Sequence, residues 1–394
     1  MTDIIRAPEH RLAGANALLW RRGELVAVAC AGVRDLDAGL PVERDTVFRI
    51  ASMSKPITTV AALMLLEEGR FELDEPINRW APELGDMRVL RSPDGPLGDT
   101  VPAARPITFD DLLTHRSGLT YGAFWPGPLA DAYDEALGGD IDSNRTPDAW
   151  IEALGTLPLI DQPGATLHYG HSTDLLGFII ARIEGAPLEA VLARRIFAPL
   201  GMKDTGFTVA PAASSRRAGD QGFDAAGNLT TLRGGPGGAF LQDRPEDMTF
   251  VSGGQGLWST LDDYLAFARL FVGDGPALLR PETLALMTTN RLTPAQRASA
   301  EVGGMPLFTH GHGYGMGVAV VMEPQQALPT ICGGPAGTVG WPGGFGGWWQ
   351  ANLHDGTIAL FLTHNMLERA QLAQGIGHGV FGAITEVAKL AETL

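Results

Sequence analysis

Apolar runs with the character of β-strands stand near both ends of this chain, and helical, loop-rich sequence separates them. Residues 17–20 and 25–32 are apolar and are split by a short polar turn, which predicts a β-hairpin. Strand-like runs return at 315–322, 348–353 and 357–362. Strands from both ends favour one sheet that is assembled from the two termini, with helices between them. The predicted fold class is therefore α/β (α+β).

This pattern also predicts two lobes. Residues 1–75 and 251–394 are expected to form an α/β lobe, and residues 76–250 are expected to form a helical lobe inserted between them. Helices are predicted at 261–271 and, closing the chain, at 366–391. A cleft is expected at the junction of the two lobes.

Charge and composition exclude several function classes. The formal net charge of -16 and the pI near 4.9 argue against nucleic acid, which proteins bind through Lys and Arg. No uncharged apolar stretch of about 18 residues and no apolar signal-peptide region is present, so we expect a cytoplasmic protein without a membrane partner. The two cysteines, Cys30 and Cys332, are far apart in sequence and fit reduced core thiols.

A helix is predicted to begin at about Ser52 and to end at Gly69, because apolar residues between them recur at helical spacing. Lys55 follows Ser52 by three residues, which places both side chains on one helix face. A serine hydroxyl needs a nearby base to act as a nucleophile. Only three lysines occur in the chain, so this spacing is informative. The alternative interpretation is a helix N-cap serine with a solvated lysine one turn later.

Four stretches in the same order, 50–56, 112–119, 199–207 and 253–257, resemble the penicillin-recognising serine enzymes. This family includes class C β-lactamases, DD-peptidases and, as the most similar group, family VIII carboxylesterases. The resemblance covers nearly the whole chain. It implies a β-lactamase-like fold, in which helices flank a central antiparallel sheet and a helical lobe is added. It also implies an N-terminal helix before the first strand, for which only about ten residues precede Leu12.

The resemblance implies a second catalytic element at Tyr169-Gly170-His171. A phenol has an ordinary pKa of about 10, so Tyr169 needs a nearby cation such as Lys55 to act as a base. Taken without the family, Tyr169 reads as a core residue with one polar contact. Class C β-lactamases have an asparagine where this chain has His171, and that asparagine contacts the substrate. His171 is therefore predicted to bind substrate, and its identity weakens the β-lactamase interpretation.

The third element is Trp341-Pro342-Gly343-Gly344, where β-lactamases and peptidases carry a lysine first. Trp341 removes that charge and suits a neutral ester better than an anionic substrate. Core packing is the alternative role for Trp341. Pro342 predicts an edge strand, because proline cannot donate a strand hydrogen bond. Carried over by position, the amides of Ser52 and Gly344 form the oxyanion hole. Trp341 and Gly343 are predicted to contact substrate.

Two further patterns are set aside. Ser172 lacks the second glycine of an α/β-hydrolase nucleophile elbow. His310 and His312 have no additional ligand at metallo-hydrolase spacing, so no metal site is predicted. The expected enzyme needs no cofactor.

The sequence therefore predicts a serine carboxylesterase that hydrolyses small or short-chain esters through an acyl-Ser52 intermediate, with Lys55 and Tyr169 as the base pair. A β-lactamase or D-amino-acid peptidase, an acyltransferase, and a catalytically inactive binding protein are the alternatives. The expected partner is a small-molecule ester. The sequence leaves open the acyl and alcohol size and whether the protein is a monomer or a homo-oligomer.

Overall fold

The computed structural model of the protein describes residues 1–125, 127–139, 141–232, 244, 248–302, 305–306, 308 and 311–393. Its central element is an eight-stranded antiparallel sheet with the order β12-β13-β14-β15-β16-β1-β2-β3. The predicted central antiparallel sheet is confirmed. The strands of this sheet are β1 (Gly14–Arg21), β2 (Glu24–Asp35), β3 (Leu40–Pro41), β12 (His312–Tyr314), β13 (Ala319–Val321), β14 (Val339–Gly340), β15 (Trp348–Asn352) and β16 (Thr357–Thr363).

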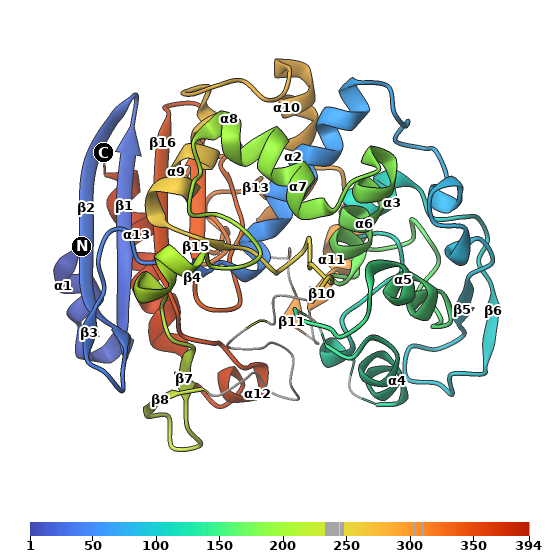
Figure 1. The fold of residues 1–394 in the computed structure, drawn as a ribbon, viewed down its shortest axis with the longest axis horizontal. Coiled ribbons are helices and arrows are strands. Elements are labelled where there is room, and N and C mark those ends of the chain that lie inside the picture. The colour runs from blue at the N-terminus through green and yellow to red at the C-terminus, as the bar shows by residue number, and fades with distance from the viewer. Residues whose placement is uncertain are drawn as a thin grey trace.

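Helices pack against this sheet and fill the other side of the molecule (Figure 1). The helices are α1 (Thr2–Arg6), α2 (Ser54–Glu67), α3 (Phe109–Leu113), α4 (Pro128–Leu137), α5 (Pro147–Gly155), α6 (Ser172–Glu184), α7 (Leu188–Leu192), α8 (Ala198–Leu200), α9 (Leu261–Ala268), α10 (Pro281–Met287), α11 (Pro294–Ser299), α12 (Arg369–Leu372) and α13 (His378–Glu392). Four two-stranded ladders complete the fold. They pair β4 (Phe48–Arg49) with β9 (Trp258–Ser259), β5 (Arg88–Leu90) with β6 (Thr100–Pro102), β7 (Gln221–Phe223) with β8 (Leu229–Thr231), and β10 (Glu301–Val302) with β11 (Met305–Pro306).

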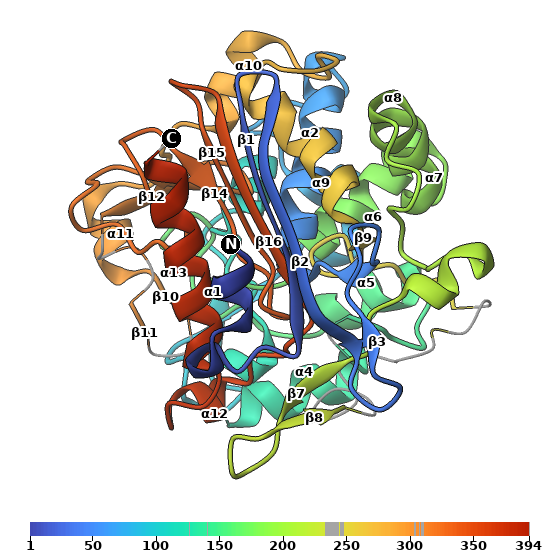
Figure 2. The same ribbon diagram turned by 90° about the vertical axis from the view of Figure 1, so that its left-hand side faces the viewer.

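Strands from the two ends of the chain lie side by side in the main sheet (Figure 2). Strand β1 pairs with β16 in a register that runs from Ala15↔Thr363 to Arg21↔Thr357. On its other side β1 pairs with β2, which confirms the predicted hairpin. The sheet therefore takes strands from both ends of the chain. The division into two lobes at residues 75 and 250 stays a prediction.

Alternate residues of the sheet face two separate hydrophobic clusters, as the two-residue period of a strand requires. Ala17 and Leu19 of β1 belong to a cluster that contains α13 and Ile5 of α1. Leu18, between them, belongs to the larger cluster that contains α2 and α9. Helices α1 and α13 lie together across one face of the sheet (Figure 2), so the short N-terminal helix that the resemblance implied is present.

Helix α2 lies between the sheet and helices α3 to α6 (Figure 1), and its buried residues occur all around its axis. A 3-10 turn, Ala51–Met53, precedes it, so the α-helix itself begins two residues after the predicted start. Gly69 ends the helix with a φ of 67°, and the Arg70 amide donates to the Leu65 carbonyl at 3.0 Å. This pair of features is typical of a glycine C-cap, which confirms that prediction.

Glycines with positive φ correct two of the predicted elements. Residues 315–322 do not form one strand, because the chain turns at Gly317, with a φ of 71°, between β12 and β13. The predicted closing helix 366–391 is two helices, α12 and α13. Gly375 and Gly377, with φ values of 83° and 86°, separate them. A left-handed backbone at a glycine interrupts both helices and strands.

The prediction that Pro342 lies on an edge strand is wrong. Strand β14 lies between β13 and β15, inside the sheet, and only Val339 and Gly340 take part in its ladders. Pro342 follows the last paired residue, so no ladder hydrogen bond is lost. Both cysteines are free thiols, as predicted, with Cys332 buried and Cys30 partly buried. Among the described residues, no helix has the length and apolar character needed to cross a membrane.

The packing of α13 on the sheet predicts a large effect for a buried side chain of this helix. Ile384 is 1% exposed, so Ile384→Ala removes buried methyl groups and leaves a cavity. We expect the free energy of unfolding in urea to fall by about 2–4 kcal/mol. Lys389→Ala, at an exposed position of the same helix, is the matched control and should change it by less than about 0.5 kcal/mol. Equal losses for the two variants would contradict this account of α13.

Candidate active site

Ser52 lies in the turn that joins strand β4 to helix α2. It is the middle residue of the 3-10 turn Ala51–Met53, and its side chain stands at the border of the buried interior with 8% exposure. Ala51 has a φ of 43°, in the left-handed region that residues with a Cβ rarely adopt. Strained backbone of this kind is often found at functional sites. The strained backbone next to Ser52 therefore supports a functional role for Ser52, in addition to its sequence motif.

The Lys55 side chain is fully buried, and its ammonium group makes three hydrogen bonds. The Nζ atom donates to Ser52 Oγ at 3.3 Å, to the Tyr121 hydroxyl at 3.1 Å and to the Gly254 carbonyl at 2.9 Å. It also lies 4.5 Å from the centroid of the Tyr169 ring, a distance typical of a cation–π contact. The structure thus brings Ser52, Lys55 and Tyr169 together and adds Tyr121.

The Tyr169 hydroxyl is held by Trp341. The indole Nε1 of Trp341 donates to the Tyr169 hydroxyl oxygen at 3.0 Å, and the two ring centroids are 5.3 Å apart. Trp341 is 4% exposed and Tyr169 is 8% exposed. Trp341 therefore combines the packing role with a polar one.

The Tyr169 loop is fixed by close backbone contacts. A Cβ on Gly170 would lie 2.3 Å from the Cα of Thr120, so only glycine lets the loop pass this segment. The His115 carbonyl accepts a hydrogen bond from the His168 amide at 2.8 Å, and its ring Nδ1 accepts one from the Gly170 amide at 3.4 Å. His115 therefore holds the residues on both sides of Tyr169, which gives the stretch 112–119 a structural role.

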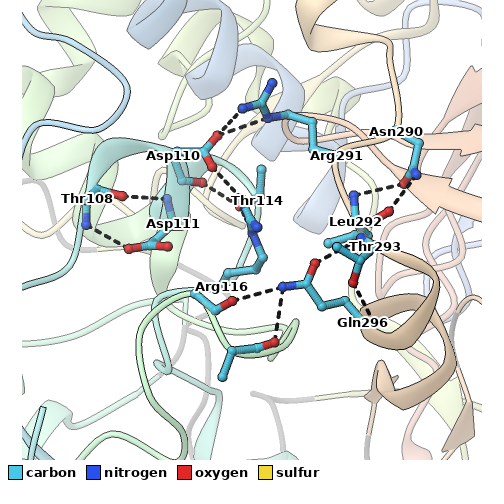
Figure 3. A network of polar contacts seen from close by, with 12 residues as sticks. Thr108, Asp110, Asp111, Thr114, Arg116, Asn290, Arg291, Leu292, Thr293 and Gln296 are labelled. Atoms are coloured by element: carbon cyan, nitrogen blue, oxygen red, sulfur yellow. Dashed lines mark hydrogen bonds and ion pairs between the residues drawn. The ribbon is translucent and has the colours of Figure 1, made fainter. Parts of the chain in front are cut away.

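A polar network holds the helix that leads into His115 (Figure 3). Thr108 and Asp111 form a reciprocal capping box at the start of α3. The Asp110 carboxylate accepts hydrogen bonds from Arg116 and, at 3.0 Å, from Arg291 Nε. The second arginine comes from the segment after α10, so this network joins distant parts of the chain around the site.

A buried carboxylate lies behind Lys55. Asp174, on α6, is fully buried and accepts hydrogen bonds from the Gly254 amide at 2.9 Å, from the Tyr121 hydroxyl at 3.4 Å and from the Ser252 hydroxyl. Its Oδ2 also lies 3.1 Å from His171 Nδ1. Asp174 therefore contacts two of the three groups that accept hydrogen bonds from Lys55.

The two glycines of the third element differ in exposure. Gly344 is exposed, and a Cβ there would meet no atom within 4 Å. Gly343 is buried, donates its amide to the Gly347 carbonyl at 2.7 Å, and packs so closely on the Ile50 carbonyl that a Cβ would lie 2.4 Å away. Substrate contact by Gly343 stays a prediction. The close contact with Ile50 places the 341–344 segment beside the nucleophile turn.

His171 lies in the buried interior, and its predicted contact with substrate stays a prediction. Its side chain is fully buried, pairs with Asp174, and is surrounded by the rings of Tyr121, Tyr133 and Trp150 at 4.5, 5.8 and 5.4 Å. His171 occupies the sequence position of the class C β-lactamase asparagine, but its side chain lies in the protein interior. The ring turns inward because a buried carboxylate three residues later on α6 is its partner.

Within the part of the chain that the structure describes, no group of three or more His, Cys, Asp or Glu residues could hold a metal ion. His310 lies outside the described residues. His312 is buried, and its Nε2 donates to the Cys332 carbonyl at 2.8 Å.

One cavity, between α5, α6 and the residues that precede α7, is lined by Pro147, Ile151 and Phe178, among other residues. Neither Ser52 nor Lys55 lines it. It is therefore not the cleft predicted between the lobes, and that cleft stays a prediction.

Comparison with known proteins decides the family. The family model described as Beta-lactamase matches residues 2–375. The chain belongs to the β-lactamase family. The predicted fold and the resemblance are thereby confirmed.

Relatives of this β-lactamase-family chain include esterases. Protein Rv1367c of Mycobacterium tuberculosis is 43% identical, over 89% of this chain and 85% of that protein. Esterase EstB of Burkholderia gladioli is 33% identical, over 91% of this chain and 88% of the esterase. The solved structure of EstCE1, a hydrolase with promiscuous acyltransferase activity, superposes with a TM-score of 0.78 at 25% identity, covering 97% of this chain and 96% of that one. These findings confirm the predicted enzyme class, a serine hydrolase.

Sequence reasoning missed three residues of the site: Tyr121, Asp174 and Gly254. Each lies in or close to a stretch that the sequence analysis names for another feature. Tyr121 follows the stretch 112–119, Asp174 stands two residues after the rejected elbow serine, and Gly254 lies in the stretch 253–257. These residues contact one another or Lys55 only in the folded protein and are far apart in sequence, so no local spacing could have predicted the contacts.

Burial of His115 predicts a pH-dependent contribution to stability. Burial, together with the nearby Lys55 charge, lowers the pKa of His115 well below its ordinary value of 6.5. Below pH 6.5 the unfolded chain therefore binds a proton that the folded protein excludes, and stability falls as the pH falls. We expect His115→Asn, which tolerates the φ of 54°, to reduce this slope by up to about 1.4 kcal/mol per pH unit.

The measurement is urea unfolding of both proteins at pH 7, 6 and 5. Thr173→Val is the matched control, because it removes the 3.4 Å contact between Thr173 Oγ1 and His115 Nε2 without removing a titrating group. It should lower stability while leaving the slope unchanged. Parallel slopes for wild type and His115→Asn would contradict the assignment of a neutral, buried His115.

Proposed function

We propose that this protein is a carboxylesterase of the family VIII type, which hydrolyses small or short-chain esters through an acyl-Ser52 intermediate. The observation that carries the proposal is the 3.3 Å hydrogen bond between Lys55 Nζ and Ser52 Oγ, inside a site where the residue at position 341 is tryptophan. The first feature supplies a nucleophile with an adjacent base. The second removes the cation that an anionic β-lactam or peptide carboxylate would need.

The proposed reaction begins when the Lys55 and Tyr169 pair accepts the Ser52 proton and Ser52 Oγ attacks the ester carbonyl. The amides of Ser52 and Gly344 then stabilise the negative charge on the carbonyl oxygen, and the exposure of Gly344 supports this role. Tyr169 donates its proton to the leaving alcohol. Its oxygen already accepts the Trp341 N–H, so the phenolate that forms is stabilised. In the second half, the same groups activate water and release the acid.

The relatives support ester chemistry. Two of them are named for it, the esterase of Burkholderia gladioli and a lovastatin esterase of Penicillium rubens, which is 32% identical over 77% of this chain and 77% of that protein. The breadth of the acyl and alcohol groups accepted by this chain is part of the proposal.

Acyl transfer to an alcohol is the second candidate function. EstCE1 is named for promiscuous acyltransferase activity, and an acyltransferase of Penicillium decumbens is 29% identical over 90% of this chain. The same acyl-Ser52 intermediate serves both reactions, and they differ only in whether water or an alcohol accepts the acyl group. Adding short alcohols to the assay and measuring ester products against free acid separates the two.

Replacement of the nucleophile tests the proposal. Ser52→Ala should lower kcat for p-nitrophenyl butyrate by about 10⁴-fold or more, because it removes the oxygen that forms the acyl-enzyme. Ser172→Ala, at the buried serine of the rejected elbow, is the matched control and should keep kcat within about tenfold. Wild-type turnover by Ser52→Ala, or loss of turnover only in Ser172→Ala, would refute the mechanism.

Substrate charge gives a further prediction. We expect kcat/KM for p-nitrophenyl butyrate to exceed that for an anionic cephalosporin by about 100-fold or more, since each 1.4 kcal/mol of lost interaction is a factor of ten. Both constants are measured with the wild-type protein at one pH. A large excess for the cephalosporin would favour the β-lactamase alternative.

A further inference from the structure

The burial of Lys55 raises a question about its counter-charge. Among the described residues the ammonium group contacts no carboxylate directly, since its three hydrogen bonds go to two hydroxyls and one carbonyl. A buried cation is costly unless charge and hydrogen bonds compensate for the lost water. The compensating charge therefore has to act through the groups that accept the hydrogen bonds.

Two of those groups are held by the same carboxylate. The Tyr121 hydroxyl accepts from Lys55 at 3.1 Å and donates to Asp174 Oδ2 at 3.4 Å. The Gly254 carbonyl accepts from Lys55 at 2.9 Å, and the amide of the same residue donates to Asp174 Oδ1 at 2.9 Å. Asp174 thus reaches Lys55 along two short routes. Because Tyr121 gives its proton to Asp174, its oxygen lone pair faces Lys55.

We propose that Asp174 is a positioning residue for the Ser52–Lys55 pair: through Tyr121 and Gly254 it orients the Lys55 amine toward Ser52 Oγ and places a negative charge behind that amine. This inference rests on the proposed function and deepens it. Asp174 touches neither Ser52 nor the reacting atoms, so its effect is carried by Lys55.

The charge of Asp174 is secured by its surroundings. Burial alone would raise the pKa of Asp174, but the hydrogen bond and charge of His171 and the charge of Lys55 outweigh burial and hold the pKa below its ordinary value. Asp174 is therefore ionised at neutral pH. An ionised carboxylate near an amine favours the ammonium form. The titratable groups around Lys55 are Tyr121 and His115 from the segment after α3, Tyr169 from the loop before α6, and His171 and Asp174 at the start of α6.

Gly254 shows how tightly this arrangement is packed. A Cβ on Gly254 would lie 3.0 and 3.2 Å from the two Asp174 carboxylate oxygens and 3.2 Å from the Tyr121 hydroxyl. Alanine at this position would displace Asp174 and Tyr121 but would remove no ionisable group. We call the hydrogen bonds from Asp174 through Tyr121 and Gly254 to Lys55 the relay. Gly254→Ala therefore changes the geometry of the relay without changing its charge.

The first test is Asp174→Asn. An asparagine keeps its oxygen toward the Gly254 amide, which can only donate, so its NH₂ group faces Tyr121 and the tyrosine proton loses its acceptor. We expect kcat for p-nitrophenyl butyrate to fall about tenfold or more with little change in KM. Loss of the negative charge removes the counter-charge behind the catalytic amine, so the acid limb of the kcat/KM profile should move to lower pH by about one unit.

Asp263→Asn is the matched control, because Asp263, on α9, is also a buried aspartate, and its partners are the Thr205 hydroxyl and the Asp204 amide. It should leave the acid limb unmoved. A merely structural role for Asp174 would lower the amplitude of the pH profile without moving it, and that outcome would overturn the proposal.

The second test is Gly254→Ala, which keeps the proposal falsifiable if Asp174→Asn does not fold. We expect a loss of kcat of about tenfold, with the fold retained in circular dichroism. Gly219→Ala is the matched control, because a Cβ there meets only the Arg34 carbonyl, at 3.5 Å. Unchanged kcat in Gly254→Ala would count against the relay.

A separate readout distinguishes failure of this inference from failure of the proposed function. The rate at which a fluorophosphonate probe labels Ser52 reports its nucleophilicity without any ester substrate. If wild type labels at Ser52 but does not hydrolyse esters, the proposed function fails, and the pH dependence of labelling still tests Asp174. If wild type and Asp174→Asn label at equal rates with the same pH dependence, the inference fails even where ester hydrolysis is established.

Discussion

The ammonium group of Lys55 is sealed from water, and the rest of the site is organised by the need to compensate for that burial. Its hydrogen bonds reach Ser52 in the same turn of chain, Tyr121 after α3 and Gly254 before β9. Behind the last two stands Asp174 at the start of α6. Four segments that are far apart in sequence must therefore meet around one charged group, which makes the site a product of the whole fold.

The features that the sequence predicted best are local ones. The Ser52 to Lys55 spacing follows from helix geometry, and Gly69 ends the helix because glycine adopts a left-handed backbone without strain. The hairpin at the start of the chain follows from two apolar runs around a polar turn. In each case the deciding interaction spans a few residues, so the pattern of residue types is sufficient.

The features that the sequence missed depend on the third dimension. Tyr121 became a partner of Lys55 only because α3 and α6 pack together, and no spacing within 112–121 indicates that contact. His171 matched a family position, yet its side chain turns inward toward Asp174, which the match in sequence did not indicate. Pro342 was expected on an edge strand because proline lacks an amide donor. In the structure the strand ends two residues earlier, and the amino-acid sequence does not indicate where it ends.

The pairing of β1 with β16 has a consequence for how the protein is made. Ala15 must pair with Thr363, so the central sheet cannot form completely until the chain as far as Thr363 has left the ribosome. Until then the hairpin of β1 and β2 exposes both of its apolar faces and an unpaired strand edge. Folds with such a high contact order form slowly and leave intermediates prone to aggregation. Yield from recombinant expression should therefore depend more on temperature and chaperone supply than on the stability of the finished enzyme.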